Sequence, residues 1–165
     1  MAGVVERNNV RVFGSGRRTL LFAHGFGCDQ NMWRFLTPSF ERDHRIVLFD
    51  YVGSGRSDLR AYSPERYGVL DGYAEDILDV RRTLAPDDDV VLVGHSVSGR
   101  SGALAAIREP SLFRALVFVS PSPRYIDDPP DYVGGFGRAD IAELLSTMDR
   151  NYIGWATALA PAIVG

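Results

Sequence analysis

The sequence predicts an α/β fold with a mainly parallel sheet, because short aliphatic runs alternate with helical stretches along most of its length. Two of these runs, Arg45–Phe49 and Val90–Val93, are continuous and apolar, as buried strands of a parallel sheet are. Ala115–Val119 is expected to form a further strand. Between the first two, Leu70–Leu84 places apolar residues at three- and four-residue spacing, which is typical of an amphipathic helix. This order of strand, helix and strand implies right-handed crossovers and parallel neighbouring strands.

The remaining elements of the predicted sheet domain are shorter. Val10–Phe13 and Thr19–Ala23 are apolar and separated by turn residues, which predicts a strand pair. Met32–Phe40 is expected to form a short helical stretch broken by Pro38, and Val97–Ile107 a helix of small residues.

The character of the chain changes after Ser120. A loop rich in Pro and Gly is followed by two predicted helices, Ala139–Met148 and Tyr152–Ile163, with no strand between them. We therefore expect residues 1–137 to form the core around the sheet and residues 138–165 to form a helical excursion from it.

The composition is that of an ordinary globular domain and excludes several kinds of chemistry. The 165 residues are 45% hydrophobic with a net charge of -3, which favours neither nucleic acid nor an anionic membrane as a partner. No apolar run approaches the ~20 residues of a membrane span, and the N-terminus lacks the apolar stretch of a signal peptide. The single Cys28 rules out an internal disulfide and fits a cytoplasmic location. The chain has no Lys, which excludes Schiff-base and Ser–Lys catalysis and favours a GC-rich, bacterial coding genome.

The stretch Val90–Gly102, "VVLVGHSVSGRSG", predicts a nucleophilic serine on a tight turn between a strand and a helix. Such a turn lifts the hydroxyl of Ser96 above the sheet and needs small residues around it. The common pattern G-x-S-x-G fails by one residue, because Ser98 stands where the second Gly is usual. The competing interpretation is an ordinary turn in which Ser96 caps the helix.

A second motif, His24-Gly25-Phe26-Gly27, directly follows the strand "TLLFA". Acyl transfer needs two donors for the developing oxyanion, and one of them comes from a loop after an early strand. We expect the backbone N–H of Phe26 to be one donor and that of Val97 the other. His24 itself is interpreted as a structural loop histidine, and Cys28 as a small hydrophobe.

A third motif, "DYVGSGRSD" at Asp50–Asp58, contains glycines after a strand. A nucleotide-binding loop is one interpretation, but neither G-x-G-x-x-G nor G-K-[ST] is present. A sharp glycine turn, with Asp50 and Ser57 bonding backbone groups, is the preferred one.

These motifs, in this order and spacing, resemble the α/β-hydrolase superfamily. The segments "AHGFGCDQNMW", "HRIVLFDYVGSGRSDLRAY" and "VGHSVSG" are most similar to RsbQ-like bacterial regulators of sigma-B energy-stress signalling and to the plant karrikin and strigolactone receptors. The resemblance implies that Ser96 is the nucleophile, that Phe26 and Val97 form the oxyanion hole, and that the helical excursion is the start of a lid. It also places an apolar ligand pocket under that lid, lined by Phe26, Tyr125, Phe136, Trp155 and Leu159.

The same resemblance implies that the triad Asp and His follow the lid, whereas this sequence ends at Gly165. Its histidines, His24, His44 and His95, all precede Ser96. We expect His44 at the end of the sheet away from the site, and the side chain of His95 to diverge from that of its neighbour. The interpretation is a C-terminally truncated α/β-hydrolase fold whose last strands are missing and whose 165 residues alone are nearly inactive. A genuine short protein is the alternative.

The expected function is therefore a serine hydrolase that cleaves a small, largely apolar ester or lactone, without a cofactor or metal. In the resembled group hydrolysis is coupled to a signalling partner, for the sigma-B regulators a PAS-domain phosphatase. A non-catalytic protein that binds a ligand or a partner without turnover is the remaining hypothesis.

Overall fold

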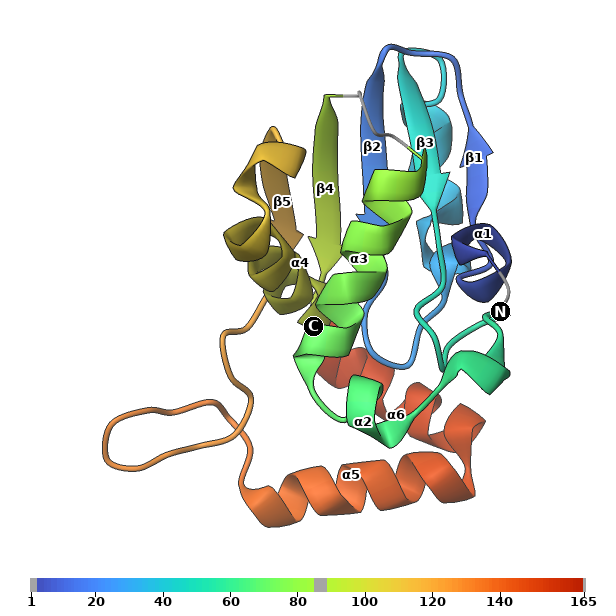
Figure 1. Cartoon of the computed structure of the whole chain (residues 1–165). Coiled ribbons are helices and arrows are strands. Elements are labelled where there is room, and N and C mark those ends of the chain that lie inside the picture. The colour runs from blue at the N-terminus through green and yellow to red at the C-terminus, as the bar shows by residue number, and fades with distance from the viewer. Residues whose placement is uncertain (1–2, 85–88, 165) are drawn as a thin grey trace. The chain divides into compact units, whose positions relative to one another are not determined.

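The computed structural model describes residues 3–84 and 89–164, and its centre is a five-stranded sheet in the order β1-β3-β2-β4-β5 (Figure 1). The strands are β1 (Arg11–Phe13), β2 (Arg18–Ala23), β3 (His44–Leu48), β4 (Val90–His95) and β5 (Ala115–Val119). Strands β2, β3, β4 and β5 run parallel, and β1 pairs antiparallel with β3. The mainly parallel sheet expected from the aliphatic runs is confirmed.

The helices follow the predicted order, with short additions. They are α1 (Val4–Arg7), α2 (Pro64–Tyr67), α3 (Leu70–Leu84), α4 (Val97–Arg108), α5 (Arg138–Arg150) and α6 (Tyr152–Val164). The helical stretch predicted around Pro38 consists of two 3-10 turns, Gln30–Phe35 and Thr37–Ser39. Within the described ranges no helix is long and apolar enough to cross a membrane.

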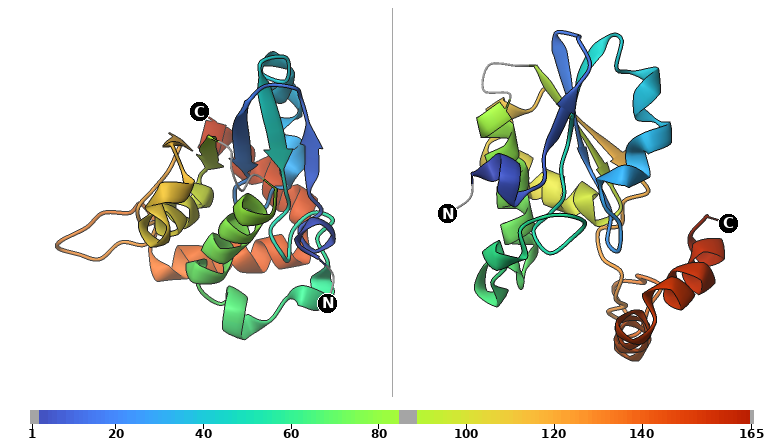
Figure 2. Two further views of the ribbon diagram at one scale, coloured as in Figure 1. Left: turned by 45° about the horizontal axis from the view of Figure 1, so that its top comes forward. Right: turned by 90° about the vertical axis from the view of Figure 1, so that its right-hand side faces the viewer.

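Alternating side chains of the sheet form two apolar layers. Leu21 and Ala23 of β2 pack with Ile77 and Leu78 of α3 on one face. Leu20 and Phe22, which alternate with them along the strand, pack on the other face with Trp33 of the first 3-10 turn and partners such as Ile46. The right-hand view of Figure 2 shows α3 and the turns of residues 30–39 on opposite sides of the sheet. Burial on both faces explains why these strands have continuous apolar sequences.

The pairing of β1 differs from the prediction. The strand pair expected between Val10–Phe13 and Thr19–Ala23 is wrong, because β1 pairs with β3 and not with β2. The connecting loop passes very close to the backbone before β3: a Cβ on Gly14 would lie 2.3 Å from His44 O, and φ is +80° at this glycine. This close approach carries the chain over the start of β3, so that β1 lies beyond it.

The chain divides into two compact units, residues 1–121 and 122–165. The division falls after Pro121, 16 residues before the predicted boundary at residue 137. The loop belongs with the second unit because it pairs with itself, through bridges between Ile126 and Phe136 and between Asp128 and Tyr132. The second unit also contains α5 and α6, the two helices that the sequence predicted.

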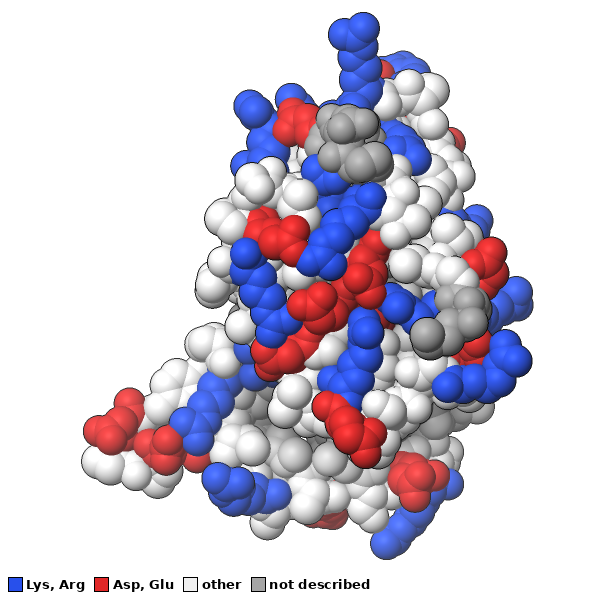
Figure 3. Space-filling view, viewed as in Figure 1, with Lys and Arg blue, Asp and Glu red and all other residues white. Residues whose placement is uncertain are grey.

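The exposed surface of α3 carries interleaved charges of both signs (Figure 3). Arg82 pairs with Glu75, Asp79 and Glu109. Arg108 pairs with Asp71 and also with Glu75. These side chains are 33–55% exposed, apart from Asp79 at 26%, so each pair adds at most about 1 kcal/mol to stability.

Candidate active site

Ser96 lies between the last residue of β4 and the first residue of α4, in a backbone conformation that L residues rarely adopt. Its φ is 57° and its ψ is -120°, and its side chain makes no capping hydrogen bond to the helix. Its N–H donates to Val119 O at 2.9 Å, so the neighbouring strand β5 holds the strained residue in place. A non-glycine residue in this region is typical of functional turns, where the rest of the fold supports the strain. Ser96 therefore does not cap the helix, and its strained turn is of the kind expected for a nucleophile elbow; its role as the nucleophile stays a prediction.

The elbow is too tightly packed for larger residues. A Cβ on Gly94 would lie 2.7 Å from Ser98 O, closer than real Cβ contacts. Ser98 itself is fully buried, at 0% exposure, so a small side chain is required there too. This supports the sequence argument that Ser98 can replace the usual Gly without disturbing the turn.

The loop after β2 lies against Ser96. A Cβ on Gly25 would be 3.2 Å from Ser96 Cβ and 2.5 Å from His95 Nδ1, so only glycine allows this approach. Phe26 is the next residue, and its side chain is 52% exposed. Val97, the other predicted oxyanion donor, is the first residue of α4. The structure thus brings the two predicted donor segments to the serine, and their role in binding an oxyanion stays a prediction.

His24 has a structural role, as the sequence indicated. It is 1% exposed, its Nδ1 lies 2.9 Å from Gly25 O, and its Nε2 accepts the N–H of Tyr51 at 3.3 Å. The second contact places the proton on Nδ1, which donates to the carbonyl. Burial lowers the pKa of His24, so the ring is neutral and both of its nitrogens are engaged.

The other two histidines lie differently. His44 pairs with Arg18 at the start of β2, whereas Ser96 follows the opposite ends of the strands, so the expectation for His44 is confirmed. The ring of His95 is edge-on to Trp33, with 6.4 Å between the ring centroids, and burial lowers its pKa. Its Nδ1 is buried against Gly25 and has no hydrogen-bond partner among the described residues.

Cys28 is partly buried, and the motif at Asp50–Asp58 forms a turn. Burial, with a smaller contribution from Asp29, raises the pKa of the Cys28 thiol, so it stays protonated at neutral pH. In the turn, Asp50 Oδ1 accepts the Gln30 N–H at 2.8 Å. Ser57 Oγ donates to Ser54 O at 2.7 Å. Asp50 Oδ2 accepts the Arg56 N–H at 2.9 Å within the turn, so the preferred interpretation, a sharp glycine turn with Asp50 and Ser57 bonding backbone groups, is confirmed.

The predicted pocket residues fall in both compact units. Phe26 belongs to the first unit, and Tyr125, Phe136, Trp155 and Leu159 belong to the second. Within the second unit Phe136 N donates to Tyr125 O at 3.1 Å, and Trp155 is 7% exposed one helical turn from Leu159 on α6. A common pocket of all five stays a prediction.

Sequence reasoning missed Tyr51. Its hydroxyl lies 2.8 Å from Ser98 Oγ, which in turn donates to the carbonyl of His24. The signal was Ser98 itself, since a hydroxyl that replaces glycine at a buried position needs a hydrogen-bond partner.

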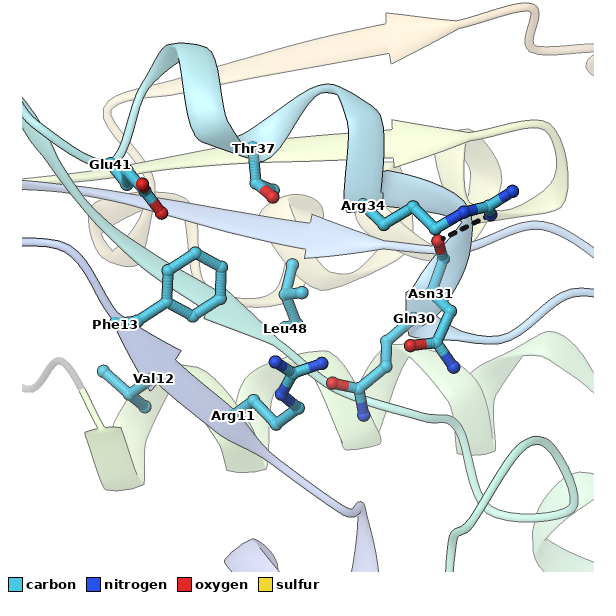
Figure 4. Close-up of a pocket in the computed structure, with 9 residues that line it drawn as sticks. All are labelled: Arg11, Val12, Phe13, Gln30, Asn31, Arg34, Thr37, Glu41 and Leu48. Atoms are coloured by element: carbon cyan, nitrogen blue, oxygen red, sulfur yellow. Dashed lines mark hydrogen bonds between the residues drawn. The ribbon is translucent and has the colours of Figure 1, made fainter.

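A hollow of about 470 Å³ lies elsewhere, between β1, β3 and the 3-10 turns (Figure 4). Its walls are formed by Arg11, Val12, Phe13, Gln30, Asn31, Arg34, Thr37, Glu41 and Leu48. None of these residues belongs to the elbow or to the loop at 24–27. Because its walls combine arginines, a carboxylate and apolar groups, the hollow favours no single class of ligand.

The sheet order and the strand–helix turn at Ser96 are those expected of an α/β-hydrolase fold, and comparison with known proteins agrees. The chain belongs to the alpha/beta hydrolase fold family, whose model matches residues 18–151.

Three known proteins illustrate how similar the relatives are. The chain is 41% identical over 165 residues to a Karrikin insensitive 2 receptor of Petunia hybrida, a match covering 100% of this chain and 60% of the receptor. It is 41% identical over 162 residues to a strigolactone esterase of Arabidopsis thaliana, covering 98% of this chain and 60% of the esterase. A solved hydrolase from Oleispira antarctica is 47% identical with a TM-score of 0.86, covering 96% of this chain and 57% of that one. The chain thus spans about 60% of the length of the receptor and the esterase.

Proposed function

We propose that this chain carries the nucleophile of a serine hydrolase that cleaves a small, largely apolar ester or lactone. The observation that carries the proposal is the strained Ser96 at the β4–α4 junction, with Gly25 against it. Ser96 Oγ attacks the substrate carbonyl while the general base takes its proton, and the amides of Phe26 and Val97 stabilise the oxyanion of the tetrahedral intermediate. The ester C–O bond then breaks, and the alcohol leaves with that proton. Water then attacks the acyl-enzyme, which releases the acid and restores the hydroxyl.

The proton of Ser96 needs a general base, and we place this base and its acid outside the described residues. His24 uses both ring nitrogens within its own loop, and His44 lies at the far end of the strands. Residues 1–165 alone are therefore expected to turn over substrate very slowly, since loss of a triad member costs about 10⁴–10⁶ in rate.

The apolar substrate class is supported by the exposed Phe26 beside the elbow and by the similarity to a strigolactone esterase. The predicted lining residues, Tyr125, Phe136, Trp155 and Leu159, are also apolar or aromatic. Such side chains suit a ligand with few polar groups.

The test is covalent labelling of the protein, in the full length that its gene encodes, by a fluorophosphonate, together with hydrolysis of p-nitrophenyl esters of increasing acyl length. We expect one adduct on Ser96 and its loss in Ser96→Ala. The matched control is Ser57→Ala, which removes a serine that is 8% exposed in the glycine turn and should leave labelling unchanged. An adduct that persists in Ser96→Ala would refute the proposal.

A signalling role is the second candidate, favoured by the similarity to a karrikin-insensitive receptor. In this version a bound or hydrolysed ligand changes the affinity for a partner in the cytoplasm, and by resemblance to the sigma-B regulators that partner is a PAS-domain phosphatase. Deletion of the gene should then change the stress-signalling output of the cell. Output that survives Ser96→Ala but is lost on deletion supports a binding protein without turnover, and output indifferent to both excludes signalling.

A further inference from the structure

The buried hydroxyl of Ser98 links the elbow to the loop that carries the predicted oxyanion donor. Ser98 Oγ donates to the main-chain carbonyl of His24, which can only accept. The hydrogen bond of 2.8 Å to Tyr51 therefore has the tyrosine O–H as donor. Burial raises the pKa of Tyr51, which keeps its proton in place for this bond. One side chain of α4 thus anchors a loop after β2 and a residue after β3.

The next peptide along the loop is fixed by its own hydrogen bonds. Gly25 O accepts His24 Nδ1–H at 2.9 Å and the N–H of Cys28 at 3.2 Å. The peptide group is planar and trans, so its C=O and N–H point in opposite directions. Two donors that hold Gly25 O therefore also set the direction of the N–H of Phe26, the predicted oxyanion donor.

The two sets of bonds meet at His24. Ser98 holds its carbonyl, and the N–H of Tyr51 holds its ring at Nε2. Without the Ser98 bond, the peptide between His24 and Gly25 loses its link to α4, the helix that begins at the nucleophile. Gly25 lies so close to Ser96 that a Cβ on it would be 3.2 Å from Ser96 Cβ, so a shift of this peptide moves the donor relative to the reacting atom.

We propose that Ser98 is a positioning residue that holds the Phe26 N–H where it can donate to the oxyanion. The Tyr51 O–H orients the Ser98 hydroxyl. The inference rests on the proposed hydrolase function. Oxyanion donors act in the transition state and not in substrate binding, so Ser98 affects kcat and leaves KM unchanged.

The test compares Ser98→Gly, Ser98→Ala and Tyr51→Phe in the full-length protein. Ser98→Gly restores the residue usual in the motif, so the elbow stays unobstructed while the hydrogen bonds are lost. We expect Ser98→Gly and Ser98→Ala to lower kcat for p-nitrophenyl acetate about tenfold or more, with KM within about twofold, because removing a whole oxyanion donor costs about 10²–10³. Tyr51→Phe keeps the bond to His24 and should lower kcat less.

The matched control is Ser57→Ala. Ser57 is buried like Ser98, and its Oγ also donates to a main-chain carbonyl and accepts one hydrogen bond. Ser57→Ala should lower the stability of the protein and leave kcat unchanged. A wild-type kcat in folded Ser98→Gly, or equal kcat losses in the Ser98 and Ser57 variants, overturns the inference.

A structural readout separates this inference from the proposed function. A crystal structure of Ser98→Ala should show residues 24–26 displaced from Ser96, and an unmoved loop overturns the inference. Failure of the wild-type protein to react with a fluorophosphonate overturns the proposed function, and the positioning role with it. Normal labelling in the wild type together with an unmoved loop overturns the positioning role alone.

Discussion

Removing the carboxylate of Asp76 should cost far more stability than removing its neighbour Asp79. Asp76 is completely buried on α3. It accepts the Tyr67 O–H at 2.9 Å, Asn8 Nδ2–H at 3.0 Å and the N–H of Val52 at 3.1 Å. Helix α3 is thereby tied to three segments, including the residue after Tyr51.

The cost follows from what Asp76→Ala leaves behind. The guanidinium groups of Arg7 and Arg66 also contact Asp76, but both keep Asp79 as a partner.

Among the neutral donors, Asn8 Nδ2 keeps its hydrogen bond to Asp50 O at 3.1 Å. The Tyr67 O–H and the Val52 N–H lose the carboxylate that they donate to. An unsatisfied buried donor costs about 1–3 kcal/mol. With water entering the space that the side chain leaves, we expect Asp76→Ala to lower the free energy of unfolding by about 3–5 kcal/mol. This is a large fraction of the ~5–15 kcal/mol that stabilises a domain.

The measurement is urea unfolding of the full-length protein followed by tryptophan fluorescence. Asp79→Ala is the control, because its side chain is 26% exposed and shares the same arginines. It should lose less than about 1 kcal/mol, as exposed ion pairs do. Equal losses in the two variants would refute the argument that the buried donors, and not the charge pairs, carry the energy.

Three further predictions concern the site. Gly25→Ala puts a Cβ 2.5 Å from His95 Nδ1, so it should displace the loop and slow fluorophosphonate labelling about tenfold or more. Labelling at the wild-type rate would show that the position of the loop does not affect the reaction. Burial raises the pKa of the Cys28 thiol, so its alkylation by iodoacetamide at pH 7 should be slower than that of free cysteine. Cys28→Ser should react with a fluorophosphonate at the wild-type rate. Rapid alkylation would contradict the partly buried position of the thiol. Burial lowers the pKa values of His24 and His95 below 6.5, so the unfolded chain binds more protons and the free energy of unfolding should fall as pH drops below 6.5. His24→Gln should flatten this fall in urea titrations at several pH values, and an unchanged slope would exclude His24 as its source.

Local patterns predicted the elements whose own residues carry a clear signal. Leu70–Leu84 and Ala115–Val119 have the predicted bounds, because helical periodicity and an aliphatic run between turns are local signals. Helices α1 and α2 were missed, since four residues leave no periodic pattern to detect.

Non-local features were out of reach of the sequence. The partner of β1 depends on the close approach of Gly14 to the backbone of His44, which no local pattern encodes. The departure at Ser98 was visible, but its partner Tyr51 is 47 residues away along the chain, so the hydrogen bond needed the folded structure. The sequence could therefore predict which residues form the turn at Ser96, but not which hydrogen bonds their side chains make.

The strain at Ser96 allows a last test of whether this residue is kept for chemistry or for structure. A capping serine would stabilise α4, and its loss would cost about 0.5–2 kcal/mol. Ser96 makes no such cap, and its φ of 57° is unfavourable for any side chain. Strain of this kind costs about 1–3 kcal/mol, and glycine relieves it while losing about 0.5–1 kcal/mol to the entropy of the unfolded chain.

Ser96→Gly should therefore be more stable than the wild type by about 0.5–2 kcal/mol and should not react with a fluorophosphonate. Ser96→Ala is the matched control, because it removes the hydroxyl but keeps the strain, so Ser96→Gly should be more stable than Ser96→Ala by the strain that glycine relieves. Urea unfolding of the three proteins measures the difference. A Ser96→Gly variant less stable than the wild type would mean that the hydroxyl stabilises the fold, and the argument that the fold supports a strained residue for the sake of its reactivity would fail.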